Sequence, residues 1–353
     1  MLYIITFNKD GYDPFLDFIK AYAIVCVLIG HVLPLHDYWG YGLWAGMQVP
    51  LFILIQSFHG LKRKSNVNWR RILTRVFIPF FIVQAMIFLA LLAIGEKPVN
   101  LCYSILRGGG GGGEGPGSYY PWIYLQIAIL LPFVRKWMAK QSVIQIALVF
   151  LLICEFFEVL LSLTDFPDLI YRILAIRYVF LIFLGWLWVN KGIVIDKLTI
   201  TFSIISFLSL VYFEYFSIND EVIFYNTVWK YHRWPCYYYV AVGGAALLHR
   251  LYQTLQRYCF AEKLIKQLAK CSYEIFLVQM LVIALYPGDY VETTLEQIGL
   301  AKSVSMVLSL LCKITVVFVL SITIGYLFNR YYNRALTTIK LNRQNIKEHE
   351  MKS

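Results

Sequence analysis

The chain has 353 residues, of which 59% are hydrophobic and 15% are charged, and its formal net charge at pH 7 is +11. Its mean hydropathy of +0.62 excludes an ordinary soluble domain, because a soluble domain of this length does not need so much apolar surface. The positive charge lies in loops between apolar segments rather than on a basic stripe with interleaved aromatic residues, so nucleic acid is not an expected partner.

Apolar segments close to the length that crosses about 30 Å of hydrocarbon recur along the whole chain. The eighth is the least regular, because basic residues and a proline interrupt it at positions 230–235. The segments predict an all-α integral membrane protein of about ten transmembrane helices, with membrane lipid around most of the chain. Their residues are 15–33, 41–61, 72–94, 119–134, 143–163, 170–189, 198–216, 222–248, 271–286 and 304–326.

The distribution of lysine and arginine tests this number independently, because a missed or added helix would invert every later loop. The positive-inside rule predicts a multi-pass protein of the cytoplasmic (inner) membrane with both termini in the cytoplasm. We expect residues 1–335 to form the transmembrane domain and residues 336–353 to form a basic cytoplasmic tail. The segments rich in lysine and arginine are 62–75, 135–140, 191–197, 250–270 and 330–352.

The first predicted helix carries two ionisable residues on one stripe. Lys20 and His31 are eleven residues apart, so at about 100° per residue they share nearly the same face, separated by about 16 Å along the axis. Each costs at least about 2.5 kcal/mol inside a membrane, which makes both candidate site residues. Asp17 lies three residues before Lys20 and can pair with it on the same stripe.

Both ionisable residues also have simpler explanations. Lys20 could extend its ammonium group to the lipid headgroups, and His31 could be an interfacial residue that hydrogen bonds with a neighbour. The shared stripe favours a functional site instead. An imidazole, whose ordinary pKa is about 6.5, is the side chain best suited to take a proton from an alcohol at neutral pH.

Two features of the next loops and helices concern phosphate binding. Arg71 and Arg75 begin the third predicted helix at i,i+4 spacing, so they share a face. Two guanidinium groups there either clamp a phosphate or only set the topology, and the sequence supports both interpretations equally. The glycine-rich segment 107–118 lacks the strand and the Lys-Ser/Thr pair of a phosphate loop, and it is predicted to be a flexible lid or spacer on the outer side.

Aromatic and acidic residues gather toward the outer side of the fourth and fifth predicted helices. Tyr119, Tyr120 and Trp122 form either an interfacial aromatic belt or a platform for a sugar ring. Glu155 and Glu158 are either ion-pair partners of Arg172 and Arg177 or catalytic groups, and neither interpretation is favoured. The seven cysteines form no CxxC motif and no Cys/His cluster at metal-ligand spacing, so no metal site is predicted.

In their order along the chain, these motifs resemble membrane-bound acyltransferase family 3. FLDFIK at 15–20, followed by His31, is similar to the first-helix signature of that family. Residues 69–79 resemble its arginine-rich third helix, residues 115–126 its outer GPGSYY segment, and residues 272–279 its late SYxIYLxH segment. The resemblance implies a ten-helix enzyme that moves an acyl group, usually acetyl, from acyl-CoA to a hydroxyl of a cell-surface glycan or a similar acceptor.

Residue by residue, the resemblance implies a catalytic role for His31 and donor-binding roles for Lys20, Arg71 and Arg75. It implies acetyl-CoA or another acyl-CoA as co-substrate, a glycan or glycolipid acceptor, and no permanently bound cofactor. His31 is expected to act as general base on the acceptor hydroxyl, while an acyl-His31 intermediate stays open. Residues expected to bind the acceptor or support the site are Asp17, Tyr119, Tyr120, Trp122, Gln126, Glu155, Glu158 and Gln279.

Two positions depart from the family pattern. Lys20 stands where the family often has arginine, which keeps the charge but loses bidentate phosphate geometry. Gln279 stands where it often has histidine, which removes a proton-transfer role but keeps a hydrogen-bonding group. A transporter or flippase for an anionic or lipid-linked glycan is the alternative function, because buried charges also suit a translocation path. A purely structural scaffold is disfavoured by the cost of those charges.

Overall fold

The chain is almost entirely helical in the residues that its structure, a computed structural model, describes: 3–8, 12–33, 48–63, 67–95, 117–164, 173–219, 234–286 and 288–350. Two short strands pair antiparallel, with Tyr3 opposite Ile195. The elements are β1 (Tyr3–Ile5), α1 (Pro14–Val32), α3 (Gln48–Lys62), α4 (Trp69–Ile72), η3 (Leu73–Phe77), α5 (Ile78–Ala93), α7 (Tyr120–Met138), α8 (Val143–Leu163), η4 (Ala175–Tyr178), α10 (Val179–Lys191), β2 (Ile193–Ile195), α11 (Lys197–Asn219), α13 (Trp234–Tyr239), η5 (Val240–Gly244), α14 (Ala245–Leu255), α15 (Cys259–Ala284), α16 (Gly288–Gln297) and α17 (Lys302–Glu350).

Five helical segments are long and apolar enough to cross a membrane, namely α1, the continuous run Trp69–Ala93, α8, α15 and α17. Together with the small amount of sheet, they make the chain a helical membrane protein, as predicted. Helices such as α3, α7, α10 and α11 occupy other predicted spans, and the number of ten spans stays a prediction. Parts of three predicted spans, and most of the glycine-rich segment, lie outside the described residues.

The two C-terminal long helices extend well beyond their predicted spans. α15 begins at Cys259 instead of residue 271, and α17 continues to Glu350 instead of ending at residue 326. Apolar length detects only the part of a helix that faces lipid. It therefore did not detect the polar turns with which both helices continue. In α15 the extension carries an i,i+4 ion pair of 2.6 Å between Glu262 and Lys266, which favours the helix.

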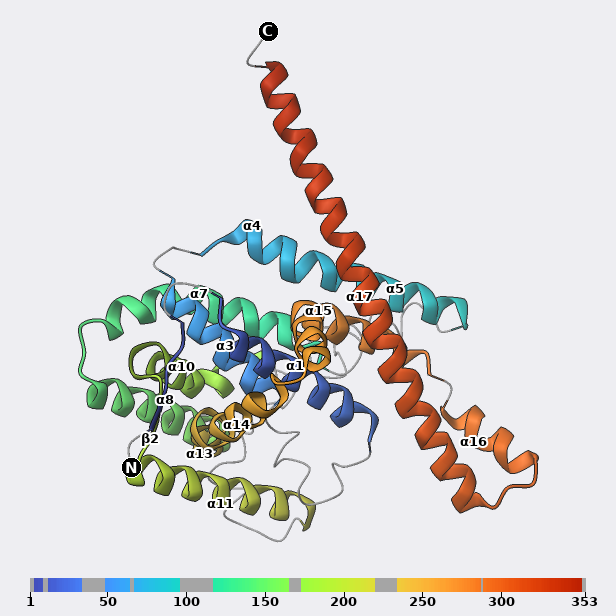
Figure 1. Cartoon of the computed structure of the whole chain (residues 1–353). Helices are drawn as coiled ribbons and strands as arrows, with labels where there is room; N and C mark the ends of the chain where they lie inside the picture. The colour runs from blue at the N-terminus through green and yellow to red at the C-terminus, as the bar shows by residue number, and fades with distance from the viewer. Residues whose placement is uncertain are drawn as a thin grey trace.

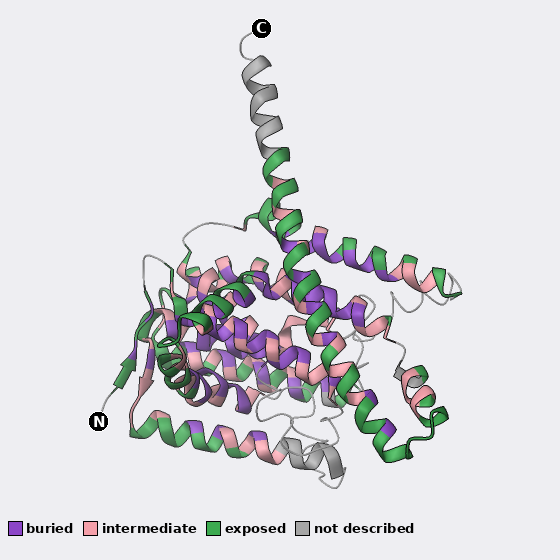
Figure 2. Ribbon diagram, turned by 45° about the vertical axis from the view of Figure 1, so that its right-hand side comes forward, coloured by how far each residue is buried: buried purple, intermediate pink, exposed green. Residues whose placement is uncertain are grey.

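The core of the bundle lies around α1, which contacts α3, α14, α15 and α17. Figure 1 shows α1 near the centre and α17 running past the bundle to a distant C-terminus. In Figure 2 the buried residues concentrate in the central helices, while the coloured parts of α11 and α17 present many exposed residues. Apolar side chains exposed on α8 and α17, such as Leu152 and Met306, are typical of a surface that faces lipid.

Glycines allow the closest approaches between these helices. A Cβ added at Gly325 of α17 would lie 2.8 Å from the backbone Cα of Ile275 in α15, so a side chain there would push the helices apart. Small residues at helix contacts are the usual means of close packing in membranes, where lipid tails are as apolar as the helices. This contact places the polar extension of α17 beside α15, and the same extension reaches η3 through Tyr332 and Thr74.

Candidate functional site

A cavity of about 610 Å³ lies between α1, α3, the α4–η3 segment, α7 and α15. Its volume is in the range of small-molecule sites. Basic side chains line one end of it, and apolar and aromatic side chains line the other. The basic group is Lys20, His59, Arg63, Arg71, Arg75 and Lys270, and the apolar group includes Val27, Val49, Phe52, Tyr120 and Phe276.

The basic end of the cavity has a strong excess of positive charge. Five lysines and arginines line the cavity, and Glu274 is the single carboxylate among its lining residues. Partial burial, together with the neighbouring cation of Arg71, lowers the pKa of Arg63. Like charges held this close destabilise one another, and a bound anion would relieve the repulsion. The cavity therefore has the electrostatics of an anion site.

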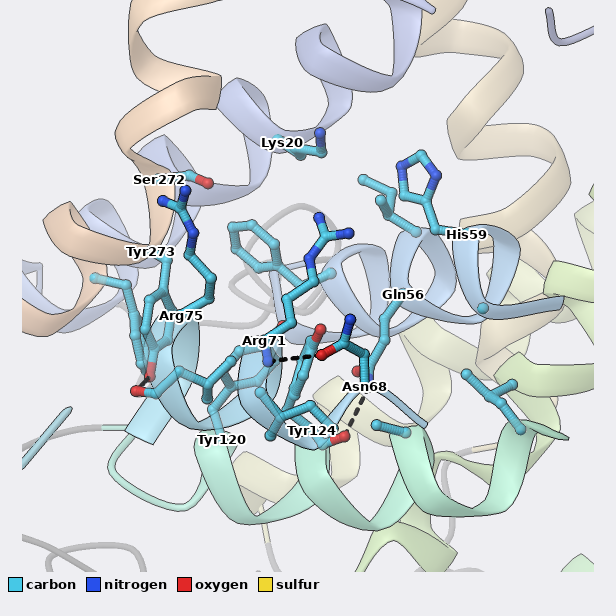
Figure 3. A pocket seen from close by; sticks show the side chains of 18 of the residues that line it. Lys20, Gln56, His59, Asn68, Arg71, Arg75, Tyr120, Tyr124, Ser272 and Tyr273 are labelled. Carbon is cyan, nitrogen blue, oxygen red and sulfur yellow. Dashed lines mark hydrogen bonds between the residues drawn. The ribbon is translucent and has the colours of Figure 1, made fainter. Parts of the chain in front are cut away.

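The structure places the predicted donor residues Lys20, Arg71 and Arg75 in this same cavity. Lys20 forms the expected ion pair with Asp17, with 2.9 Å between its Nζ and a carboxylate oxygen. Figure 3 shows Arg71 extending into the space between Lys20 and His59, and Arg75 extending toward Ser272. The two arginines thus meet the lysine of α1 from another helix, although 51 residues separate Lys20 from Arg71 in the sequence.

Local structure and a distant helix together hold the arginine pair. The side chain of Asn68 caps the start of α4 by accepting a 2.9 Å hydrogen bond from the backbone N–H of Arg71. The next five residues, η3, form a π-helical turn, which is a rare geometry that is frequent at functional sites. Asn333 of α17 accepts a hydrogen bond from the guanidinium of Arg75. Tyr332 donates a 2.6 Å hydrogen bond to the backbone carbonyl of Thr74.

His31 lies near the end of α1, where it contacts α15. Its Nδ1 is 3.0 Å from Oε1 of Gln279, which is fully buried. An amide oxygen only accepts hydrogen bonds, so in a neutral imidazole this contact places the proton on Nδ1 and leaves the lone pair on Nε2. The pair therefore holds the ring in the tautomer that a general base requires.

The cavity ends about one helical turn, roughly 6 Å, before this histidine. Val27 lines the cavity four residues before His31 in α1, and Phe276 lines it three residues before Gln279 in α15. Gly117 has a φ of +86°, and a Cβ there would lie 2.8 Å from the Phe276 ring and 3.9 Å from Cε1 of His31. Phe276 and Gly117 thus close the space between the cavity and the histidine.

The predicted aromatic group at the start of α7 divides between the cavity and the helix contacts. Tyr120 lines the cavity and meets the ring of Phe276 edge-on, with 5.5 Å between the ring centroids. Trp122 instead packs against Phe77 of η3, with a centroid distance of 5.4 Å, and Tyr119 packs on the apolar core. For these three residues the acceptor-binding role stays a prediction.

Gln126 holds α7 against the segment that leads into η4. Its amide donates a 2.5 Å hydrogen bond to the carbonyl of Ile173 and accepts a 3.0 Å bond from the backbone N–H of Ala175. The nitrogen and the oxygen of the Gln126 amide thus both bond to backbone, which fixes the position of the first turns of α7, where Tyr120 lies. Gln126 does not line the cavity, and its predicted role in acceptor binding or support stays a prediction.

The predicted acidic pair belongs to a different part of the bundle. Glu155 accepts a 2.7 Å hydrogen bond from the indole N–H of Trp234, and Glu158 is fully buried. Neither residue lines the cavity. One of the two predicted arginine partners, Arg172, lies outside the described residues. The structure does not bring this pair together with Lys20, the arginines and His31.

Sequence analysis did not identify several residues that line the cavity or support it. His59 satisfies the criterion that selected His31, an ionisable residue inside an apolar segment, and could have been found in the same way. Arg63 and Lys270 were counted as loop charges that set topology. Asn333 carries no signal, since an asparagine in a polar tail is unremarkable until the fold places it against Arg75.

Comparison with known proteins identifies one similarity. A family model described as an acyltransferase domain matches residues 13–330. No curated protein and no solved structure matches the chain. The matched region begins at the residue that caps α1 and ends within α17, so it contains both the basic end of the cavity and the His31–Gln279 pair. Tyr332 and Asn333, which contact the arginine segment, lie just beyond it.

Proposed function

The chain belongs to this acyltransferase family and is a membrane acyltransferase, and we propose that it transfers an acyl group, first of all acetyl, from acyl-CoA to a hydroxyl of a cell-surface or lipid-linked glycan. One observation carries the proposal. The cavity has an excess of cations at one end. Its other end is apolar and lies about one helical turn from His31, whose ring is held in the tautomer that a general base requires.

The chemical layout of acyl-CoA supports this assignment. Its phosphates lie at one end of a flexible pantetheine arm, and the thioester lies at the other. Guanidinium groups such as those of Arg71 and Arg75 suit phosphate oxygens, with Lys20 as a further point charge. The arm has a length comparable to the rise of about 16 Å between Lys20 and His31. Phosphates at the basic end would therefore bring the thioester to the apolar end, near His31.

In the proposed reaction His31 acts as general base. The acceptor hydroxyl oxygen attacks the thioester carbonyl carbon while its proton moves to Nε2 of His31. The carbon–sulfur bond then breaks, the acyl group remains as an ester on the acceptor, and the leaving thiolate takes the proton back from the imidazolium. Gln279, which accepts from Nδ1, would stabilise the imidazolium that forms between the two steps.

The membrane orientation follows from the positive-inside rule and remains part of the proposal. With both termini in the cytoplasm and ten spans in the inner membrane, the basic end of the cavity faces the compartment that holds acyl-CoA. Gly117 and the aromatic start of α7 then face outward, where a glycan would enter beside Tyr119, Tyr120 and Trp122. In this arrangement residues 1–335 are the catalytic membrane domain and residues 336–353 are a cytoplasmic tail.

The activity is tested with inverted membranes that contain the full-length protein. We expect label from acetyl-CoA, labelled in the acetyl group, to appear in glycan or glycolipid, and not in matched membranes that lack the protein. Several glycan acceptors should be supplied, and the protein should be shown to be folded and monodisperse after extraction. Absence of transfer with every acceptor, combined with movement of an anionic glycan across the membrane, would contradict the proposal and favour the transporter.

The length of the acyl group should depend on Phe276. Its ring closes the apolar end of the cavity, packed by Tyr120 and by the backbone at Gly117. In Phe276→Ala the space at this end grows, so we expect the preference for acetyl-CoA over hexanoyl-CoA to fall by about tenfold, the scale of apolar discrimination in such pockets. Competition between the two labelled donors measures this ratio.

The control for that change is Phe260→Ala. Phe260 lies on the same helix but is 79% exposed and far from the cavity lining. It should leave the preference between the two donors as in the wild-type enzyme. An unchanged preference in Phe276→Ala, with activity on acetyl-CoA retained, would show that another part of the cavity limits the acyl chain.

A further inference from the structure

A second polar surface lies on α17, outside the cavity described above. Arg330, Asn333, Arg334, Thr337 and Thr338 follow the i, i+3, i+4, i+7, i+8 spacing, so they form one stripe on the helix. A stripe that a helix turns toward its neighbour is ordinarily apolar. Here every member of the stripe is a hydrogen-bonding residue, and two of them carry a fixed positive charge.

This stripe lines a groove of about 680 Å³ between α17 and α15. Lys270 and Gln267 of α15 form the opposite wall, and Tyr326 stands one turn before Arg330. The contact of Gly325 with Ile275 fixes the register of the two antiparallel helices, which places Lys270 level with Arg330. Basic side chains therefore approach the groove from both walls.

The lining of the groove carries three cations, and Glu274, four residues from Lys270 on α15, lines the main cavity instead. None of the residues that line the groove is an aspartate or a glutamate. Two ion pairs of the chain, Lys20 with Asp17 and Lys266 with Glu262, do not involve the cations of the groove. Three cations around one polar groove repel one another, so an anion is the natural occupant.

We propose that this groove is a second anion site, which binds a phosphate group between Lys270, Arg330 and Arg334. Two guanidiniums provide bidentate donors for phosphate oxygens, and the ammonium of Lys270 adds a point charge from the opposite wall. The site goes beyond the acyl transfer proposed above and does not depend on it. Lys270 and Asn329 also line the main cavity, so the two sites share a wall.

The surroundings of the groove favour the headgroup of an anionic phospholipid as the source of this phosphate. On the side toward the apolar part of α17, Leu327 and Ile324 are 39% and 36% exposed, a surface suited to acyl chains. A basic pocket between helices at the membrane edge is a recurrent site for anionic headgroups. The other source of the same chemistry is a soluble phosphate ligand such as coenzyme A.

The test uses purified full-length protein in a neutral detergent, titrated calorimetrically with short-chain phosphatidylglycerol, short-chain phosphatidylcholine and coenzyme A. We expect the double variant Arg330→Gln/Arg334→Gln to bind phosphatidylglycerol about tenfold more weakly or worse, and more so at low salt. Phosphatidylcholine, which has no net charge, should bind weakly to both proteins. Arg250→Gln/Arg257→Gln removes equal charge from exposed positions that do not line the groove, and should bind like wild type.

Two further variants make the result decisive. Arg330→Lys/Arg334→Lys keeps the charge but loses the guanidinium fork, so its affinity should lie between those of wild type and the glutamine variant. Arg71→Gln should leave phosphatidylglycerol binding unchanged, which separates this site from the main cavity. If the glutamine variant bound coenzyme A more weakly but phosphatidylglycerol as well as wild type does, the groove would be a phosphate site for a soluble ligand. Wild-type affinity of the glutamine variant for both ligands would overturn the proposal.

Discussion

Replacing His31 with alanine should reduce acyl transfer by about 10²- to 10⁴-fold, the range that a positioned general base contributes. The variant loses the Nε2 lone pair that is proposed to receive the hydroxyl proton, while the basic end of the cavity, about 16 Å away, keeps its charges. Binding of acetyl-CoA should therefore change little. Transfer of labelled acetyl groups to the acceptor measures the first effect, and equilibrium binding of acetyl-CoA to the purified variant measures the second.

Two companion variants separate chemistry from packing at His31. His31→Gln keeps a hydrogen-bonding side chain of similar reach but cannot accept a proton at neutral pH, so it should be as inactive as His31→Ala. His249→Gln alters a histidine of α14, whose ring packs against Phe15 at the N-terminal end of α1, and it should retain activity. A rate for His31→Gln within tenfold of the wild-type rate would rule out both the general-base role and the acyl-His31 intermediate.

The arrangement within α1 could be predicted because it depends only on helical geometry. One continuous helix from Pro14 to Val32 carries Asp17, Lys20 and His31, so the predicted ion pair forms at 2.9 Å and the stripe follows from the rise and turn per residue. The apolar segments likewise located most helices, since apolar length is a local property of the sequence.

Contacts between distant parts of the chain could not be predicted in this way. His31 meets Gln279 across 248 residues, and Arg75 meets Asn333 across 258 residues. The approach of Gly117 to Phe276 depends on a positive φ and on the register of two helices. Apolar length also could not show that α17 continues as a polar helix, yet that extension contributes Asn329 to the cavity lining and holds Arg75 through Asn333.

Removing the arginine pair should weaken use of the acyl donor. Hydrogen bonds to charged groups contribute about 1.5–3 kcal/mol, and the lower value applies here because both side chains remain open to solvent. Arg71→Gln and Arg75→Gln should thus each raise the KM for acetyl-CoA by about tenfold, and the double variant by about a hundredfold. The kcat should change much less, because the apolar end of the cavity and His31 are untouched. Initial rates across a range of acetyl-CoA concentrations separate the two constants.

Arg70→Gln is the matched control for this pair. Arg70 is adjacent, also exposed and equally charged, but it does not line the cavity. If the positions of Arg71 and Arg75 determine donor binding, and not net charge alone, the KM of Arg70→Gln for acetyl-CoA should stay within about twofold of the wild-type value. An equal rise in KM for Arg70→Gln would mean that the basic surface only attracts the anionic donor, and that no defined phosphate contact exists.

Substitution of Asn333 should reveal whether Arg75 needs its full charge. The amide accepts from the guanidinium without neutralising it, so Asn333→Ala loses this positioning contact, and a 2.8 Å bond to the Asn329 carbonyl, and should raise the KM modestly. Asn333→Asp keeps the shape and the hydrogen bond but places a negative charge against Arg75, which would compete with a donor phosphate. We therefore expect aspartate to raise the KM more than alanine does, and increasingly so at low salt. If Asn333 served packing alone, the order would reverse, because aspartate is the closer replacement in size and hydrogen bonding.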